Sequence, residues 1–294
     1  MIYRNRLSEV VILRERGLMP IERSQDPAQF SAFELSGWDK NIDGYDRAFG
    51  DVSRQTVRPL LDAAKVTDSM RVLDVCCGPG MLAAGALQRG AEAVGIDFSS
   101  EAVALAGRLV PAGSFQQADA QALPFPAASF DAVLCGYGLM HVPDPEAVLR
   151  EMHRVLRPGG RAAVSVWDAG AVGFKLIYEA VKAYGTMDAN LPHGPDFFQF
   201  ASPQSMKAAL TQAGFADCAA KSVAQDWQVD DAHEYVDAIL TGTVRARAVL
   251  AAQSSGAMES VKAFLAERLE EFRGQGGHIA IPLPALVGSG AREP

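Results

Sequence analysis

The chain has 294 residues, of which 49% are hydrophobic and 21% charged. These proportions are ordinary for a globular protein and exclude a disordered or collagen-like chain. Acidic residues outnumber basic ones by 35 to 27, giving a formal net charge of -8 at pH 7. A surface of this sign repels phosphate backbones and anionic membranes, so neither nucleic acid nor a membrane is an expected partner. No apolar run reaches the roughly 18 residues that a membrane-spanning helix needs.

The first segment, MIYRNRLSEVVILRERG, places only four apolar residues between its charges. Such a run is too short for the core of a signal peptide, and no small-residue cleavage site follows it. The cysteines show no zinc-ligand spacing, which indicates reduced thiols; they are Cys76, Cys77, Cys135 and Cys218. We therefore expect a cytoplasmic protein without a metal site.

Between residues 71 and 167, short apolar runs rich in β-branched residues alternate with helical patterns. This alternation is typical of a parallel sheet with crossover helices. The predicted strands span 71–75, 93–97, 114–118, 131–135 and 161–167, and the predicted helices span 82–89, 101–110 and 145–156. Residues 119–130 lack a helical period and contain two prolines, so we expect a loop there.

The flanking segments are predicted to be mainly helical. Upstream, residues 38–65 read as helical cover; downstream, helices are expected at 174–184, 203–213 and across 231–273, with an extended stretch at 218–229. The closing run HIAIPLPALVGSG is apolar enough for a strand, although its two prolines predict an edge or a bulge. The order of elements predicts a doubly wound α/β sheet with helical insertions.

A glycine-rich turn follows the first predicted strand in VLDVCCGPGMLAAGAL. Gly78 and Gly80 allow close approach of a ligand, and the N-terminus of the next helix supplies free amide donors for an anionic or carboxylate group. Alone, the turn also matches the dinucleotide fingerprint weakly, and a turn without a ligand fits equally well.

Two carboxylates favour a nucleoside ligand without a diphosphate. Asp97 ends the second predicted strand at the spacing where a carboxylate meets a ribose diol. Asp74 stands just before the turn, where it can hold loop amides or receive an ammonium group, and where it would repel a pyrophosphate. The pattern therefore indicates a zwitterionic ligand.

On these residues the sequence resembles class I S-adenosylmethionine-dependent methyltransferases, particularly the branch of the ubiquinone/menaquinone C-methyltransferases and their small-molecule relatives. The motifs that carry the resemblance are LDVCCGPG, AVGIDFS, ADAQALPFPAASFDAV and VLRPGGRAAVSVW, within about residues 45–167. One departure is Cys76, where the family usually has glycine or alanine.

The resemblance implies a Rossmann-like fold with a seven-stranded, mostly parallel sheet. It implies a helical cover over residues 1–55 and a core over 56–294, with insertions at about 170–213 and 231–275. The cofactor it implies is S-adenosylmethionine, with the ribose held by Asp97 and the adenine placed by Phe98, Asp119 and the Ala120 backbone. The methionyl part would be surrounded by Asp74, Cys76, Gly78 and Gly80 and closed off by Tyr45, for which an ordinary half-buried tyrosine is the alternative.

The implied reaction is methyl transfer to a small-molecule acceptor by in-line displacement, in which alignment supplies much of the rate. If the acceptor must lose a proton, His141 is the candidate base and Tyr137 the candidate orienting residue, since both follow the fourth predicted strand. The alternative for His141 is a structural role in its loop.

Residues 185–202 combine His193 with three phenylalanines in a loop long enough for a lid over an apolar acceptor cavity. The same phenylalanines could instead dock the insertion on the sheet. Oxygen, carbon and nitrogen acceptors all remain open, and a homodimer is compatible with the sequence. The alternatives to an enzyme of this class are a cofactor-binding protein without catalysis and a nicotinamide-dependent oxidoreductase, the latter disfavoured by Asp74.

Overall fold

The structure, a computed structural model, describes residues 26–294. Its centre is a seven-stranded sheet in the order β3-β2-β1-β4-β5-β9-β6. The strands are β3 (Ser114–Gln117), β2 (Glu92–Asp97), β1 (Arg71–Val75), β4 (Phe130–Gly136), β5 (Leu156–Trp167), β9 (Ala285–Ala291) and β6 (Ala216–Val223). Strands β1 to β5 pair in parallel, and β9 is antiparallel to both of its neighbours. The predicted doubly wound, mostly parallel sheet is confirmed.

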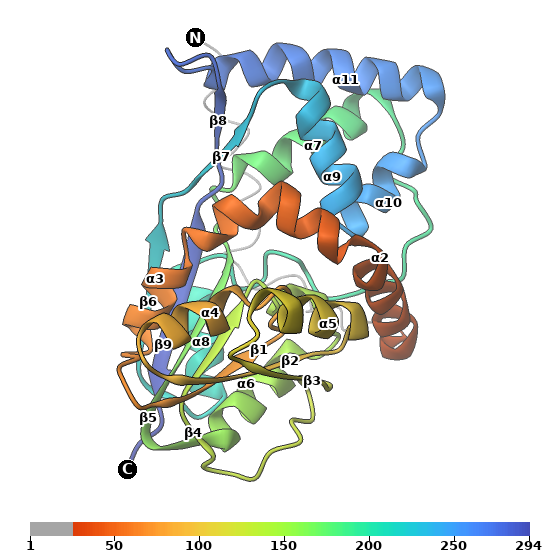
Figure 1. Cartoon of the computed structure of the whole chain (residues 1–294). Helices are drawn as coiled ribbons and strands as arrows, with labels where there is room; N and C mark the ends of the chain where they lie inside the picture. The colour runs from red at the N-terminus through yellow and green to blue at the C-terminus, as the bar shows by residue number, and fades with distance from the viewer. Residues whose placement is uncertain (1–25) are drawn as a thin grey trace.

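Helices cover both faces of the sheet and continue into an upper layer (Figure 1). They are α2 (Pro27–Arg54), α3 (Val57–Ala63), α4 (Met81–Gln88), α5 (Ser100–Leu109), α6 (Pro145–Val155), α7 (Val172–Tyr184), α8 (Pro203–Gln212), α9 (Ala232–Gly242), α10 (Arg245–Ala251) and α11 (Ser255–Leu269), with short 3-10 turns η1 (Leu139–His141) and η2 (Glu270–Phe272). Residues 119–129 form the expected loop.

Local sequence explains where the helices begin. The carboxylate of Asp144 accepts a hydrogen bond from the Ala147 amide at 2.9 Å, and Pro145 occupies the first turn of α6, where its missing N–H is not needed. The Ser99 hydroxyl caps α5 in the same way by accepting from the Ala102 amide at 3.1 Å. These caps fix the starts of helices that pack on the sheet.

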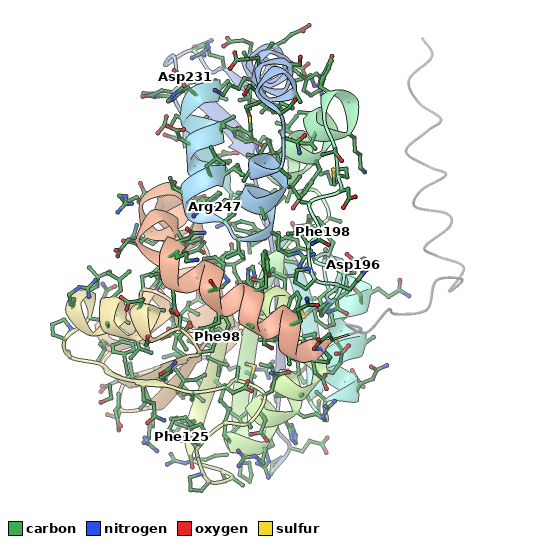
Figure 2. All side chains as sticks on the ribbon, turned by 90° about the vertical axis from the view of Figure 1, so that its right-hand side faces the viewer. Phe98, Phe125, Asp196, Phe198, Asp231 and Arg247 are labelled. Atoms are coloured by element: carbon green, nitrogen blue, oxygen red, sulfur yellow. The ribbon has the colours of Figure 1, made fainter. Side chains whose placement is uncertain are left out.

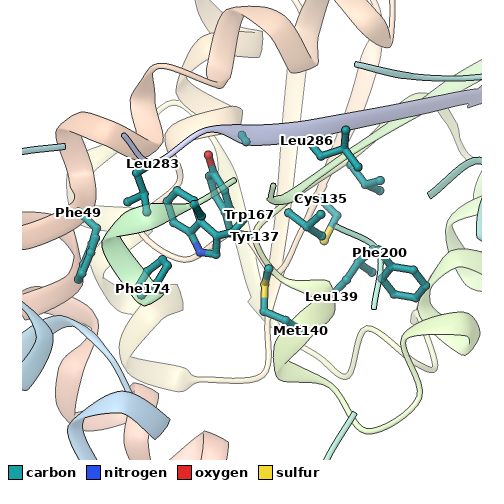
Figure 3. Packing of buried hydrophobic residues seen from close by; sticks show 14 of the residues in the cluster. Phe49, Cys135, Tyr137, Leu139, Met140, Trp167, Phe174, Phe200, Leu283 and Leu286 are labelled. Atoms are coloured by element: carbon teal, nitrogen blue, oxygen red, sulfur yellow. The ribbon is translucent and has the colours of Figure 1, made fainter. Parts of the chain in front are cut away.

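The central strands β1 and β4 are buried on both faces, as expected where crossover helices cover a parallel sheet. On one face Tyr137 stacks on Trp167, with ring centroids 4.1 Å apart. Figure 3 shows this pair with Phe49 and Phe174 beside it, while Phe200 lies against the Leu139 side of the same cluster. The apolar core therefore reaches the carboxyl ends of the strands.

The proline-containing run near the C-terminus is extended, as predicted, but it forms more than one strand. It forms two strands: β8 (Ile279–Pro282) pairs with β7 (Asp226–Val229) in a separate ribbon, and β9 lies inside the main sheet. Pro282 ends β8 and Pro284 lies between the strands, so neither proline interrupts the β9 ladder. The expected edge strand is therefore β8 in its two-stranded ribbon, whereas β9, which contains no proline, lies inside the main sheet.

Helix α2 runs between the sheet and the upper layer of α7, α9, α10 and α11 (Figure 1). It packs closely on the end of α9, because a Cβ on Gly44 would lie 2.1 Å from the Thr241 carbonyl oxygen. It is tied to α5 by the Ser99 hydroxyl, which donates to the Asp39 carboxylate at 2.6 Å. Helices α2 and α3 agree with the helical pattern expected upstream of the sheet, and residues 1–25 lie outside the described part. Over residues 26–294 no helix is both long and apolar enough to span a bilayer.

Candidate active site

A cavity of about 230 Å³ opens at the carboxyl ends of the parallel strands, under α2. Ligand sites of open α/β sheets form at this edge. The sequence-predicted site residues that line it are Tyr45, Asp74, Cys76, Gly78, Asp97, Phe98, Asp119, Ala120, Tyr137 and His141. Figure 2 shows Phe98 below α2 and Arg247 above it, so α2 forms the roof of this region. The cavity therefore collects residues from the ends of the five parallel strands and from α2.

The glycine-rich turn shapes the floor of the cavity. Gly78 has φ +50° and Gly80 has φ +84°, conformations that favour glycine. Gly80 begins α4 but lies behind the wall, where a Cβ would meet Val110 at 3.1 Å and Phe115 at 3.3 Å. Gly80 thus shapes the turn, whereas Gly78 faces the cavity.

Asp74 is buried beneath the first turn of α4. Its carboxylate accepts a hydrogen bond from the Ala83 amide at 3.0 Å, and so satisfies one free donor of the helix. Burial raises the pKa of Asp74 well above its usual range, against the lowering effect of that hydrogen bond. Burial therefore disfavours a negative charge on Asp74, and a cationic ligand group beside it would favour the ionised form.

Asp97 fixes the glycine-rich turn while facing the cavity. One oxygen accepts from the Gly78 amide at 2.9 Å and the other from the Ser99 amide at 3.0 Å. Burial raises the pKa of this carboxyl group, and the two amides oppose the shift. A carboxylate oxygen can accept more than one hydrogen bond, so both oxygens retain capacity for a pair of neighbouring hydroxyls.

Cys76 has φ +55°, which explains why a residue without a large side chain is usual at this point of the motif. Hydrogen bonding with Cys135 and burial raise the pKa of the Cys76 thiol well above its usual range. A Cβ on Gly138 would lie 2.8 Å from the Cys76 Sγ and 2.9 Å from the Cys135 Sγ. The sulfur atoms therefore fill the space that Gly138 leaves, and all four cysteines are free thiols.

At the adenine end suggested by the sequence, Asp119 is exposed and Ala120 is buried. Asp119 accepts hydrogen bonds from the Gln121 amide at 2.8 Å and the Gln121 side chain at 3.1 Å. Gln121 in turn accepts from the Asp144 amide at 3.1 Å. Sequence reasoning missed Gln121, although an Asp followed two residues later by a hydrogen-bonding partner is a recognisable turn signal.

Both tyrosines are held by neutral hydrogen bonds. The Tyr137 hydroxyl donates to the Gln225 side chain at 2.8 Å, and burial raises its pKa above the usual range. The Tyr45 hydroxyl shares a 2.8 Å hydrogen bond with Ser53, and burial raises the pKa of Tyr45 to about 12. At neutral pH both phenols stay protonated, and Tyr137 serves as a fixed wall with its hydroxyl already engaged.

His141 ends the η1 turn and contacts α2. Its Nδ1 lies 2.9 Å from a carboxylate oxygen of Glu34, whose side chain is 0% exposed, while the imidazole is 19% exposed. The Trp38 ring packs edge-on against the imidazole at 4.9 Å between centroids. Neither Glu34 nor Trp38 was found from sequence, because about a hundred residues separate them from His141 and no local pattern links them.

A second cavity, of about 50 Å³, adjoins the first. The two share Trp38, Tyr45, His141 and Trp167, and the second is otherwise walled mainly by the rings of Phe49, Phe174, Tyr178 and Phe197. Its charged side chain is Arg245, whose guanidinium lies 5.6 Å from the Phe30 ring and donates to the Pro192 carbonyl at 3.1 Å. The second cavity is thus mostly aromatic, with one cation in its wall.

The phenylalanines of the loop over residues 185–202 take both roles that the sequence left open: lining a cavity and docking the insertion on the core. Phe197 lines the second cavity and lies 6.0 Å from the His141 ring, whereas Phe200 is buried in the core. Figure 2 places Phe198 and Asp196 at the level where α2 meets the upper helices. His193 is exposed and does not line either cavity. Within residues 26–294, no three His, Cys, Asp or Glu side chains cluster as metal ligands would.

Comparison with known proteins gives matches over the same region. Residues 73–164 match the model of the methyltransferase domain family. The demethylmenaquinone methyltransferase of Thermus thermophilus is 35% identical over 178 residues, which cover 54% of this chain and 80% of that protein. The ubiquinone/menaquinone biosynthesis C-methyltransferase of Xanthomonas oryzae is 34% identical, covering 58% of this chain and 76% of that one. The 2-phytyl-1,4-naphtoquinone methyltransferase of Synechococcus elongatus is 34% identical, covering 60% and 65%.

Solved structures share the fold at lower identity. The YcgJ protein of Bacillus subtilis superposes with a TM-score of 0.53 at 21% identity, covering 81% of this chain and 98% of that one. A methyltransferase-like protein from Bacillus halodurans gives a TM-score of 0.51 at 18% identity, covering 81% and 99%. Both likenesses support the doubly wound sheet.

Proposed function

The chain belongs to the class I S-adenosylmethionine-dependent methyltransferases, in the ubiquinone/menaquinone-like branch, and from this premise we propose that its acceptor is a planar, largely apolar ring compound bound in the aromatic cavity. The family defines the reaction as methyl transfer from S-adenosylmethionine to a small-molecule acceptor. The single observation that carries the proposal is the second cavity, which meets the first at His141 and is walled by aromatic rings.

The larger cavity fits the cofactor chemically. Asp97 would accept hydrogen bonds from the ribose hydroxyls, and Phe98 and Ala120 would hold the adenine. Asp119 would accept a hydrogen bond from the adenine amine in place of the one that the Gln121 side chain now donates. Asp74, Cys76 and Gly78 would surround the methionyl part, where the buried Asp74 carboxylate suits an ammonium group. When bound, S-adenosylmethionine supplies an activated methyl group on a positive sulfur.

The aromatic walls favour a flat acceptor, because ring faces pack on rings with little loss of side-chain entropy. The names of two relatives specify a menaquinone precursor and a naphthoquinone, which are ring compounds. Arg245 and Tyr178 line the far part of the cavity, and their polar atoms would suit an oxygen substituent or carboxylate on the ring. Trp167 lines both cavities, and Tyr137 stacks on it from the side of the larger one.

The acceptor cavity must open to admit such a compound. Its 50 Å³ is far below the ~300 Å³ at the lower end of ordinary ligand sites. The segment that would move is the loop over residues 185–202, which contributes Phe197 to the wall. Closure of this lid over the acceptor would also exclude water from the sulfonium.

His141 would act as the general base where the acceptor is a hydroxyl or an acidic carbon. It lies on the boundary of the two cavities, while the Tyr137 hydroxyl is already committed to Gln225. General-base assistance typically contributes ~100- to 10,000-fold, so His141→Gln should lower turnover within that range and leave cofactor affinity nearly unchanged. An amine acceptor that needs no deprotonation would show little effect.

Several broader expectations accompany this proposal. The division into a cover, a core and two insertions, the cytoplasmic location and the absence of a nucleic-acid partner stay predictions, as does a homodimer. None of them is needed for the acceptor assignment.

The test is methyl transfer from methyl-labelled S-adenosylmethionine to paired ring compounds. A naphthol and the matching hydroxynaphthoate differ only in a carboxylate, and binding of either should quench fluorescence of Trp38 and Trp167. We expect labelled product from at least one, with tighter binding of the hydroxynaphthoate that is lost in Arg245→Met. Binding of cofactor without transfer to any planar compound, alongside transfer to small aliphatic amines, would contradict the proposal.

A further inference from the structure

The pair formed by Glu34 and His141 joins two distant parts of the chain at the boundary of the cavities. Glu34 lies on α2, and His141 ends η1 after the fourth strand. Their side chains meet at 2.9 Å between Oε2 and Nδ1. Burying a carboxylate opposes folding unless the carboxylate has partners. The contact between the wholly buried Glu34 and the proposed base therefore calls for a reason.

Glu34 is only partly satisfied by this contact. Its other oxygen, Oε1, is buried without a hydrogen-bond partner among the described residues. The nearby Tyr178 on α7 has its pKa raised by burial and by the charge of Glu34, and lowered by Arg245. Natural proteins rarely leave buried polar atoms unpaired, and such atoms call for a functional explanation.

We propose that Glu34 is a positioning residue that fixes the tautomer and orientation of His141 for deprotonating the acceptor. This inference rests on the proposed function of His141. A carboxylate can only accept, so the neutral imidazole must place its proton on Nδ1 and donate it to Glu34 Oε2. The lone pair is then on Nε2, the nitrogen that can take a proton from an acceptor.

The surroundings of His141 hold the ring against other orientations. Trp38 packs edge-on against it at 4.9 Å, and Phe197 lies 6.0 Å away on the lid side. A second carboxylate, Asp97, interacts with the charge of the imidazole, and this interaction partly opposes the rise that burial causes in the Asp97 pKa. A proton gained on Nε2 during reaction gives an imidazolium, whose charge the Glu34 carboxylate at Nδ1 stabilises directly.

The arrangement also links acceptor chemistry to the helical cover. Because α2 supplies Glu34, Trp38 and Tyr45, the base is complete only when this helix is seated over the strand ends. Gly37 permits this seating, since a Cβ there would lie 2.4 Å from the Val244 side chain.

The first test is the ring-nitrogen NMR spectrum of His141 in the full chain, recorded at alkaline pH where the imidazole is neutral. We expect the wild-type ring to carry its proton on Nδ1. Glu34→Gln, whose amide can also donate to Nδ1, should yield a mixture of tautomers, and Glu34→Leu should remove the Nδ1–H preference. A wild-type ring protonated on Nε2 would overturn the inference without any variant.

The second test is turnover with the acceptor identified by labelled methyl transfer. Glu34→Gln should lower kcat by at least about tenfold and by no more than the ~100- to 10,000-fold expected for loss of the base itself. KM for the cofactor should stay unchanged. Asp43→Asn is the matched control, because Asp43 lies on the same helix and is 62% exposed. If His141→Gln loses turnover while Glu34→Gln keeps wild-type kcat, the positioning role is wrong and the proposed base stands. If neither variant loses turnover, the proposed base role fails as well.

Discussion

Replacing Asp97 with asparagine tests how the larger cavity holds its cofactor. The carboxylate binds the Gly78 and Ser99 amides at 2.9 and 3.0 Å and retains capacity for the ribose hydroxyls. Hydrogen bonds to a charged group contribute about 1.5–3 kcal/mol. Since 1.4 kcal/mol corresponds to a tenfold change in Kd, Asp97→Asn should weaken S-adenosylhomocysteine binding by about 10- to 150-fold.

Isothermal titration calorimetry measures this change directly, and the melting temperature without ligand shows whether the fold is intact. Asp119→Asn is the comparison variant, because Asp119 is exposed and its hydrogen bonds compete with water. We expect its effect to be clearly smaller than that of Asp97→Asn. An Asp97→Asn protein that melts like the wild type and binds with unchanged Kd would remove Asp97 from the cofactor site.

Three further predictions concern charge, thiols and the lid. The folded-state pKa of Asp74 is raised above its unfolded value of about 3.8. The contribution of Asp74 to stability is therefore fully present below that pH and is lost as pH rises toward the folded-state pKa, by up to about 1.4 kcal/mol per pH unit. Asp74→Asn should remove this part of the pH dependence in denaturant titrations of the cofactor-free protein, and a parallel pH dependence in both proteins would contradict the assignment. Because the pKa of the Cys76 thiol is also raised, it should stay protonated at neutral pH and react slowly with iodoacetamide, as followed by mass spectrometry; alkylation at the rate of an unfolded thiol would count against this. Phe197→Ala should raise KM for the acceptor without changing cofactor affinity, because Phe197 lines the smaller cavity. Phe200→Ala should instead lower the free energy of unfolding by about 3–5 kcal/mol, because Phe200 is buried in the core. Hydrogen exchange over residues 185–202 that is slow without ligand and does not respond to ligand would argue against a lid.

The grouping of residues around the larger cavity could be predicted from sequence because its signals are local. Strand ends, the glycine-rich turn and the acidic residues after each strand lie within residues 71–141, and the parallel sheet brings successive strand ends to one edge. Asp74, Asp97 and Gly78 therefore lie together as expected. The positive φ of Cys76 also accounts for the residue type that the family pattern favours there.

The smaller cavity could not be predicted in the same way. Its walls come mainly from α2, α7, the loop over residues 185–202 and the connection between α9 and α10, which meet only in the folded chain. Glu34 looked like an ordinary charged residue in a helical segment, yet it is wholly buried against His141. The C-terminal run with its two prolines was treated as one strand, because proline rules apply to a single strand at a time. The segment in fact supplies β8 to one sheet and β9 to another.

A crystal structure of the protein with S-adenosylhomocysteine tests the central claim most directly. The account predicts that the ribose contacts Asp97 and that the sulfur, the position from which the methyl leaves, faces the boundary between the two cavities near His141 and Trp167. The acceptor would then approach from the aromatic side. A sulfur directed away from that boundary, or an adenosine bound among the rings of the smaller cavity, would contradict the account.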